Sequence, residues 1–219
     1  MNYRVIDPEQ YYRKGVFRHF SEDCKCSVSM TARVDVTDLV RWSKDTGTKF
    51  YINFLYALSK ALNSRDDYKM GWRWETRELI CYDRINPTQY VFHEDTETCT
   101  PVYTTYNEEY PAFYRDALAD VGKAKQTREY GLDAANHPNW FDASYISWLS
   151  YDSMNIELPD GYLYFMPIVN WGRYREENGR LMMPVSVRMN HAVADGYLVA
   201  NVFRALEKEM ENLCARDGL

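Results

Sequence analysis

The chain has 219 residues, of which 46% are hydrophobic and 26% are charged, the composition of a soluble globular protein. The formal net charge of −6 and the lack of a basic stripe argue against nucleic acid as a partner. No apolar run approaches the ~20 residues of a membrane span, so no membrane partner is expected, and five cysteines without a CxxC pair fit reduced thiols in a cytoplasm.

The N-terminal part reads as one helix followed by a strand and two more helices. The first helix is predicted to start at Asp7 as its N-cap, with Pro8 as its first helical residue, and to end at Phe20. The hydrophobic pattern then predicts a strand, a short helix closed by Gly47 and a core helix, over 24–36, 36–47 and 49–64.

The rest of the chain reads as strands interrupted by two helices. Strands are predicted over 69–73, 78–82, 89–93, 98–105, 143–150, 161–174 and 179–189. A long surface helix is predicted over 107–131, and a final amphipathic helix starts near Asp195. Because strict βαβ alternation is missing, the pattern predicts an α/β or α+β fold around a large mixed β-sheet. No Pro/Gly/Ser-rich linker occurs, so residues 1–219 are expected to form a single domain.

The segment "MPVSVRMNHAVADGYLVANVF" (183–203) holds the clearest chemical signal. His191 follows directly on a strand pattern and precedes a helix pattern, a position from which a general base can reach a substrate. The alternative is a surface or core-edge histidine bonded to backbone. Asp195 completes an H-x-x-x-D-G arrangement, and by itself it reads equally well as the N-cap of the helix.

These residues resemble a known family. "NHAVADGYLV" is similar to the active-site signature of the chloramphenicol acetyltransferases, and its H-x-x-x-D-G core also occurs in the acyltransferase subunits of 2-oxo acid dehydrogenases and in peptide-synthetase condensation domains. "KFYINFLYALSKALN" (49–63), "YVFHEDTETCTPVYTTY" (90–106) and "RLMMPVSVRMNHAVADG" (180–196) favour the first family. The resemblance implies a two-layer sandwich with a large mixed sheet, acetyl-CoA as cosubstrate, no metal, and a homotrimer with active sites between subunits.

The resemblance also implies three residues that act in the reaction. His191 matches the general base that takes the proton of an acceptor hydroxyl, which then attacks acetyl-CoA directly in a ternary complex. Ser144, in "ASYISWLSYDS", matches the oxyanion donor, although it also reads as an ordinary strand serine. Asn170 stands where the family has a threonine that helps to hold the tetrahedral intermediate through water.

Other residues match supporting positions of the family. Asp195 matches the aspartate that pairs with an arginine near the N-terminus, and that arginine is Arg13, which otherwise reads as a solvated helix charge. Trp148 and Tyr174 match aromatic groups near the coenzyme, with ordinary core or interface packing as the alternative.

The acceptor is less clearly indicated than the reaction. Phe20 and Cys26 fit the family's acceptor pocket, whereas Val28 stands where a large aromatic residue usually lines the antibiotic. Residues 115–140 are too divergent for pocket positions to be placed. We therefore expect a cytoplasmic acetyl-CoA-dependent O-acetyltransferase resembling chloramphenicol acetyltransferase. The alternatives are an acetyltransferase for another hydroxylated small molecule and a non-catalytic small-molecule-binding protein on the same scaffold.

Overall fold

The structure is a computed structural model that describes residues 2–133, 136–159 and 162–216. Its main feature is a seven-stranded mixed sheet with strand order β2-β10-β8-β7-β5-β6, to which β9 adds by pairing with β10. The strands in that order are Ser27–Asp35, Arg180–Asn190, Ile168–Gly172, Trp140–Ile146, Asn86–His93 and Thr98–Tyr103, and β9 is Arg175–Glu177. Strand β10 runs antiparallel to β2 and β8, whereas β7 runs parallel to β8 and β5.

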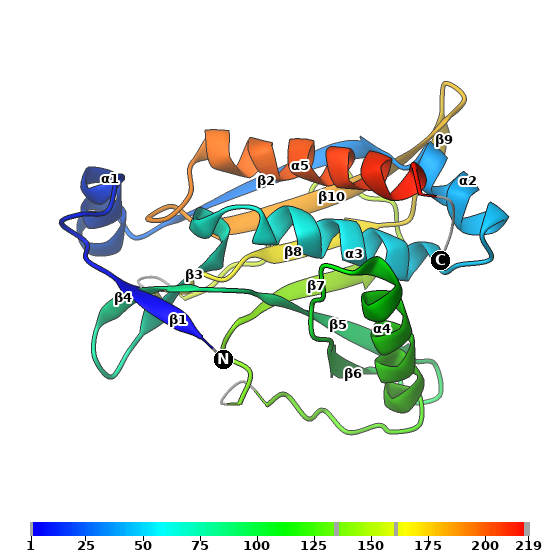
Figure 1. The fold of residues 1–219 in the computed structure, drawn as a ribbon, viewed down its shortest axis with the longest axis horizontal. Helices are drawn as coiled ribbons and strands as arrows, with labels where there is room; N and C mark the ends of the chain where they lie inside the picture. Colours follow the sequence, from blue (N-terminus) through cyan, green and yellow to red (C-terminus); the bar gives the residue numbers. More distant parts are fainter. Residues whose placement is uncertain (1, 134–135, 160–161, 217–219) are drawn as a thin grey trace.

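Helices cover one face of this sheet. Figure 1 shows α3 and α5 side by side along the sheet, with α4 over the β6 end. The covering helices α2, α3, α4 and α5 are Thr37–Asp45, Phe50–Asn63, Tyr110–Ala124 and Gly196–Cys214. The second layer confirms the expected two-layer arrangement around a large mixed sheet.

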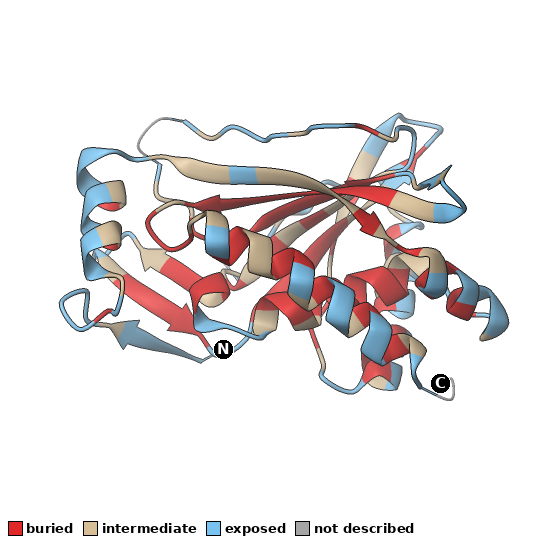
Figure 2. Cartoon of the chain, turned by 90° about the horizontal axis from the view of Figure 1, so that it is seen from above, coloured by how far each residue is buried: buried red, intermediate tan, exposed pale blue. Residues whose placement is uncertain are grey.

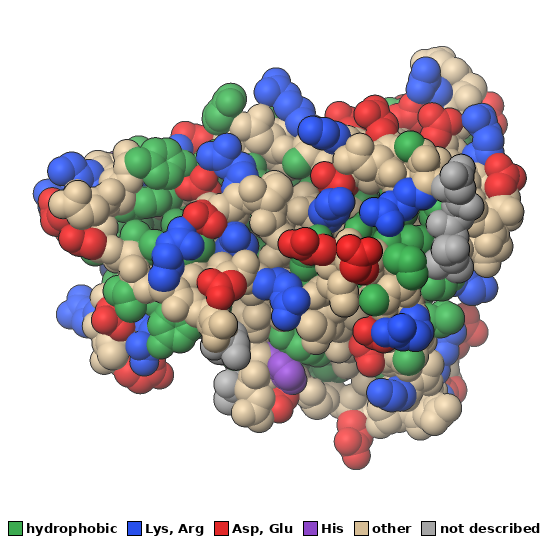
Figure 3. Space-filling view, in the orientation of Figure 1, with side chains coloured by type: hydrophobic (Ala, Val, Ile, Leu, Met, Phe, Trp, Pro, Cys, Tyr) green, Lys and Arg blue, Asp and Glu red, His purple; other side chains and the backbone are tan. Residues whose placement is uncertain are grey.

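The main core lies between these layers because each element turns its apolar residues inward. Strand β10 alternates, so that Val185, Val187 and Met189 are buried toward the helices, and α3 buries most of its length. Figure 2 shows the buried residues concentrated on the central strands and on the sheet-facing side of the helices. On the opposite side of the helices, acidic and basic side chains are interspersed, as Figure 3 shows.

A small antiparallel sheet stands beside the main one and carries the N-terminal segment. Its order is β1-β4-β3, with bounds Tyr3–Ile6, Glu78–Tyr82 and Met70–Arg73. After β1 the chain turns at Asp7, and then forms α1 (Lys14–Arg18) and a π-helical turn (His19–Asp23). None of the helices within the described ranges is long and apolar enough to cross a membrane.

The N-terminal helix prediction was wrong in its start. Residues before Lys14 are not helical, and Asp7 is a turn residue whose Oδ1 accepts a hydrogen bond from the Glu9 amide at 2.9 Å. Aspartate readily forms such local turns, which compete with helix capping. The strand predicted over 161–174 forms only at Ile168–Gly172, and the surface helix predicted over 107–131 is limited to Tyr110–Ala124.

Candidate active site

His191 is the first residue after β10, and two contacts fix its position. Its backbone N–H donates to the carbonyl oxygen of Cys26 at 3.0 Å. Its ring stacks on Phe20, with ring centroids 3.7 Å apart and an interplanar angle of 7°. The Nδ1 atom is buried and has no hydrogen-bond partner among the described residues, which leaves Nε2 as the nitrogen open to a reacting group. The stack sets the plane of the imidazole, as a general base requires.

Asp195 lies at the end of the loop that carries His191. Its contacts agree with both interpretations of the sequence, the N-cap of the final helix and the partner of Arg13. Its Oδ1 accepts from the Leu198 amide at 3.0 Å, which makes it the N-cap of α5. Its Oδ2 accepts from Arg13 Nη2 at 2.8 Å. Burial raises the pKa of Asp195, but the hydrogen bonds from Arg13 and the Leu198 amide outweigh it, so the pKa lies below its usual value. The carboxylate therefore ties the N-terminal arm to the loop that carries His191.

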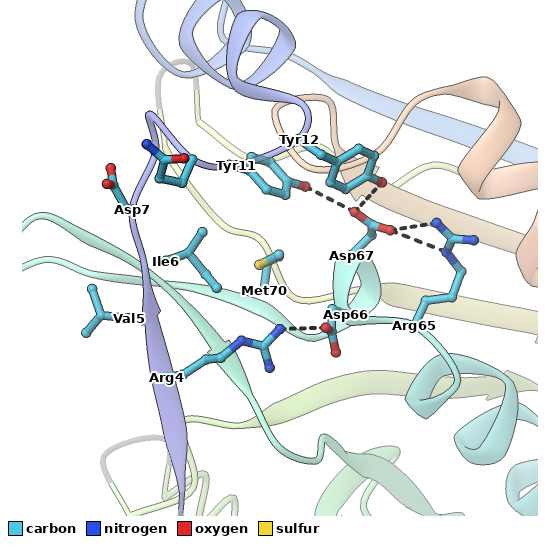
Figure 4. A pocket seen from close by; sticks show the side chains of 11 residues that line it. Arg4, Val5, Ile6, Asp7, Tyr11, Tyr12, Arg65, Asp66, Asp67 and Met70 are labelled. Atoms are coloured by element: carbon cyan, nitrogen blue, oxygen red, sulfur yellow. Dashed lines mark hydrogen bonds and ion pairs between the residues drawn. The ribbon is translucent and has the colours of Figure 1, made fainter.

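Arg13 reaches Asp195 because the two tyrosines before it are themselves anchored. Tyr11 and Tyr12 donate to Asp67 Oδ1 at 3.1 and 2.7 Å, and Arg65 donates to its Oδ2 at 2.9 Å. Figure 4 shows this convergence on Asp67 at the wall of a cavity of about 550 Å³. Asp67 is only 4% exposed. It is a supporting residue that the sequence did not reveal, because its two tyrosine partners lie far away in the sequence.

Ser144 and Asn170 lie on the face of the sheet that points away from the helices. Ser144 in β7 pairs in register with Asn170 in β8, and Asn170 pairs with Ser186 in β10. Ser186 Oγ lies 2.7 Å from Thr31 Oγ1 of β2, so the row is polar across four strands. The structure therefore brings the two expected residues Ser144 and Asn170 together as neighbours.

The same register separates Ser144 from His191 within one chain. His191 is five residues beyond Ser186, which is in the same cross-strand row as Ser144. At about 3.3 Å per residue this is ~16 Å along the strand, and two strand spacings add ~10 Å across it. No histidine side chain spans such a gap. A reaction that uses both residues needs them from two chains.

Asp142 makes the face beside Ser144 more polar. It lies two residues before Ser144 in β7, and its oxygens accept from Tyr90 Oη at 2.6 Å and from Tyr164 Oη at 3.2 Å. Burial raises the pKa of this carboxyl group, although both tyrosines counteract the shift.

The two expected coenzyme aromatics follow the parallel strands β7 and β8. Trp148 is 55% exposed and packs edge-on against Phe92 at 4.6 Å between centroids. Tyr174 is half-buried and packs edge-on against Phe50 at 5.5 Å. Both lie past the carboxyl ends of their strands, on the side of Ser144 that is remote from His191.

The expected acceptor residues fall into two groups. Phe20 and Cys26 contact His191 directly, as described above, and burial raises the pKa of the Cys26 thiol. Val28 pairs in register with Met189 and packs, half-buried, against the core on the helix side. Its place in a pocket stays a prediction. No group of three or more His, Cys, Asp or Glu side chains in the described part of the chain is arranged to hold a metal.

Comparisons with known proteins agree along nearly the whole sequence. Residues 1–207 match the family model described as "Chloramphenicol acetyltransferase". A chloramphenicol acetyltransferase of Vibrio anguillarum is 30% identical over 100% of this chain and 99% of its own length. Chloramphenicol acetyltransferase 3 of Escherichia coli is 29% identical over 95% of this chain and 97% of its own length.

Solved structures show the same fold. A chloramphenicol acetyltransferase with 19% identity superposes with a TM-score of 0.89 over 95% of this chain and all of that one. A probable dihydrolipoamide acetyltransferase of Listeria monocytogenes, 17% identical, superposes with a TM-score of 0.61 over 99% of this chain and 97% of that one.

Proposed function

The chain belongs to the chloramphenicol acetyltransferase family, and on this premise we propose that it is an O-acetyltransferase that uses acetyl-CoA to acetylate a hydroxylated small molecule. The observation that carries the proposal is the geometry of His191: a stacked imidazole with its Nδ1 buried and its Nε2 open. A ring held in one plane at a strand end is pre-organised to accept a proton from a bound hydroxyl.

The proposed reaction passes through a ternary complex. His191 Nε2 takes the proton of the acceptor hydroxyl while the oxygen attacks the thioester carbon of acetyl-CoA. The Ser144 hydroxyl donates a hydrogen bond to the oxyanion that forms, and Asn170 supports that position from the next strand. The tetrahedral intermediate then expels the CoA thiolate, which recovers the proton from the imidazolium. The products are an O-acetyl ester and the free CoA thiol.

Two further groups would support this reaction. The ion pair between Arg13 and Asp195 holds the loop of His191, and it is an organising contact that takes no proton itself. Trp148 and Tyr174 offer aromatic surface to the coenzyme beyond the ends of β7 and β8. Phe20 and Cys26, and with them Val28, belong to the acceptor side of the site.

We further propose that the active protein is a homotrimer with its sites between chains. The separation of His191 from Ser144 along the sheet supports this, because a cyclic assembly can place the histidine of one chain against the serine of its neighbour. Residues 1–219 would act as one acyltransferase domain, and the cysteines and charge fit a cytoplasmic protein.

The test is a thiol-release assay with acetyl-CoA against chloramphenicol and a panel of hydroxylated compounds. The proposal predicts CoA release that depends on the acceptor, together with an acetylated product found by mass spectrometry. A folded protein that binds the acceptors but releases no thiol would instead be a non-catalytic binding protein.

A further inference from the structure

Arg188 is a buried cation that forms no ion pair with any acidic side chain in residues 2–133, 136–159 and 162–216. It lies in β10, three residues before His191, and is only 7% exposed. Its Nη2 donates to Ser27 Oγ at 2.5 Å, and its Nη1 is buried without any partner. Burial lowers the pKa of Arg188, yet a guanidinium stays charged at neutral pH. A buried charge with no counter-charge is costly, so this guanidinium is well suited to bind an anionic group of a ligand.

The side chain lies on the polar face of the sheet. Because Val187 and Met189 turn toward the helices, Arg188 turns the other way, as do Ser186 and Asn190. There it lines a groove of about 320 Å³. The groove is formed by β2, β10 and the chain around 155–159 and Tyr162.

Neither acidic residue nearby neutralises the guanidinium. Glu157 lines the same groove but forms no ion pair or hydrogen bond with Arg188 in the described structure. Asp142 stands in the same cross-strand row, two strands away across Ile168, and its oxygens are occupied by two tyrosines. Two strand spacings are ~10 Å, too far for a direct contact. Lys25 adds a second positive charge to the groove.

The groove adjoins His191 through two of its lining residues, although His191 itself is not part of the lining. Two of its lining residues, Cys26 and Asn190, are respectively the backbone partner of His191 and its neighbour in sequence. His191 lies three residue steps beyond Arg188, which is ~10 Å between their backbone positions. A molecule that spans this distance would bring a hydroxyl to the imidazole while a second group meets the guanidinium.

We propose that the acceptor is a hydroxylated carboxylic acid, whose carboxylate binds to Arg188 while its hydroxyl faces His191. The proposal rests on the proposed acetyltransferase function and deepens it by naming the class of acceptor. An Arg–carboxylate contact in a buried groove is charge-assisted and among the stronger hydrogen bonds. Chloramphenicol has no ionised group and leaves this guanidinium unpaired, so an acid is the better fit.

The first test uses the native protein and a matched pair of acceptors, para-(hydroxymethyl)benzoate and its methyl ester. Thiol release from acetyl-CoA gives kcat/KM for each, and the unfolding midpoint with each compound, without acetyl-CoA, reports binding. We expect the acid to be preferred about 10- to 100-fold in kcat/KM, the size of one hydrogen bond to a charged group. Equal rates for acid and ester, with equal binding, would overturn the assignment.

The second test uses variants of the arginine. Arg188→Gln keeps length and donors but removes the charge, and should abolish the preference for the acid. Arg188→Lys should retain part of it. Arg204→Gln, an exposed position on α5, is the control and should keep the native preference. An Arg188→Gln protein that still prefers the acid contradicts the proposal. A second result would also contradict it: the native protein shows no preference for the acid, and the Arg188→Gln variant changes its oligomeric state. Arg188 would then pair with a neighbouring chain.

Failure of this inference differs from failure of the proposed function. Thiol release with the ester and no preference for the acid leaves the acetyltransferase standing and removes the carboxylate. Selective binding of the acid with no thiol release from any acceptor supports the carboxylate site and removes the acetyltransferase.

Discussion

His191 combines a fixed ring plane with one open nitrogen, and this residue is where the account is most specific. Replacement of His191 by Ala should lower turnover about 10²- to 10⁴-fold, because the acceptor hydroxyl loses its base. Thiol release under saturating acetyl-CoA measures the effect, and circular dichroism checks the fold. His137→Ala is the control and should keep near-native turnover, since His137 stacks on Tyr103 of the edge strand β6, four strands away from β10 in the same chain. Retention of more than about a tenth of the turnover by the His191 variant would contradict the assignment.

Asp195 and Arg13 give a second prediction at the same scale. Asp195→Asn still caps α5 but leaves Arg13 without its carboxylate, so turnover and stability should both fall. The pair is partly buried, so the loss should be larger than the about 0–1 kcal/mol of an exposed pair and smaller than the about 3–5 kcal/mol of a fully buried one. Arg13→Ala should behave similarly. In a double-mutant cycle on unfolding and turnover, the combined effect should be smaller than the two single effects together.

The pH dependence of this pair follows from the lowered pKa of Asp195. A carboxyl group with a depressed pKa in the folded state stabilises fully above its unfolded pKa of about 3.9, and the contribution is lost as the pH falls through the folded value. The difference in the free energy of unfolding between native protein and Asp195→Asn should therefore be constant from about pH 5 to 8 and shrink only in stronger acid.

The double-mutant cycle of Arg13 and Asp195 can also contradict the pairing. Additivity of the two single effects within about 0.3–0.5 kcal/mol would mean that the two residues do not interact.

The N-terminal arm shows how one element depends on a contact far away in the sequence. Asp67→Ala removes the acceptor of Tyr11, Tyr12 and Arg65 together, so it should destabilise by at least about 1–3 kcal/mol. It should also lower turnover by loosening Arg13. The adjacent Asp66→Ala is the matched control, because Asp66 is half exposed and its loss should cost about 1 kcal/mol or less. The denaturant midpoints of the two variants decide the matter, and equal effects would refute the anchoring role of Asp67.

Elements with a strong hydrophobic periodicity were predictable from the sequence. The alternation of β10 and the apolar spacing of α3 and α5 identified the layers and their inner faces, because one buried face dictates the pattern. The N-terminal arm was not predictable, since its short β1 is mostly exposed and is fixed by pairing with β4. The segment between β7 and β8 was also misread, because aromatic residues such as Tyr162 and Phe165 pack against Trp74 and Phe17 of the N-terminal part, and most of the predicted strand does not pair in the sheet.

The residues of the candidate site were likewise predictable only where the signal is local in the sequence. His191 and Asp195 were visible because strand, loop and helix follow one another directly in sequence. Their link to Arg13 was available only through the family resemblance, and the contacts of Asp67 and Arg188 were not available at all. These two depend on strand register and on packing between distant segments, and a single sequence does not show either.

For the whole molecule, we expect a working site to need residues from two chains. The sheet register keeps His191 and Ser144 of one chain ~16 Å apart along the strands. The proposed cyclic trimer would solve this by repeating one head-to-tail contact, so that each site would take its base from one chain and its oxyanion donor from the next.

Subunit complementation tests this claim most directly. His191→Ala and Ser144→Ala are each expected to be nearly inactive, and the two chains are co-expressed with different tags so that mixed assemblies can be isolated. Each mixed trimer regains one intact site in three, so the purified mixed trimers should show about a third of native thiol-release activity. Random assembly makes about three in four trimers mixed, so the unfractionated preparation should show about a quarter. Activity of the purified mixed trimers no higher than that of either variant alone would show that both residues serve the same chain's site, and would contradict the account.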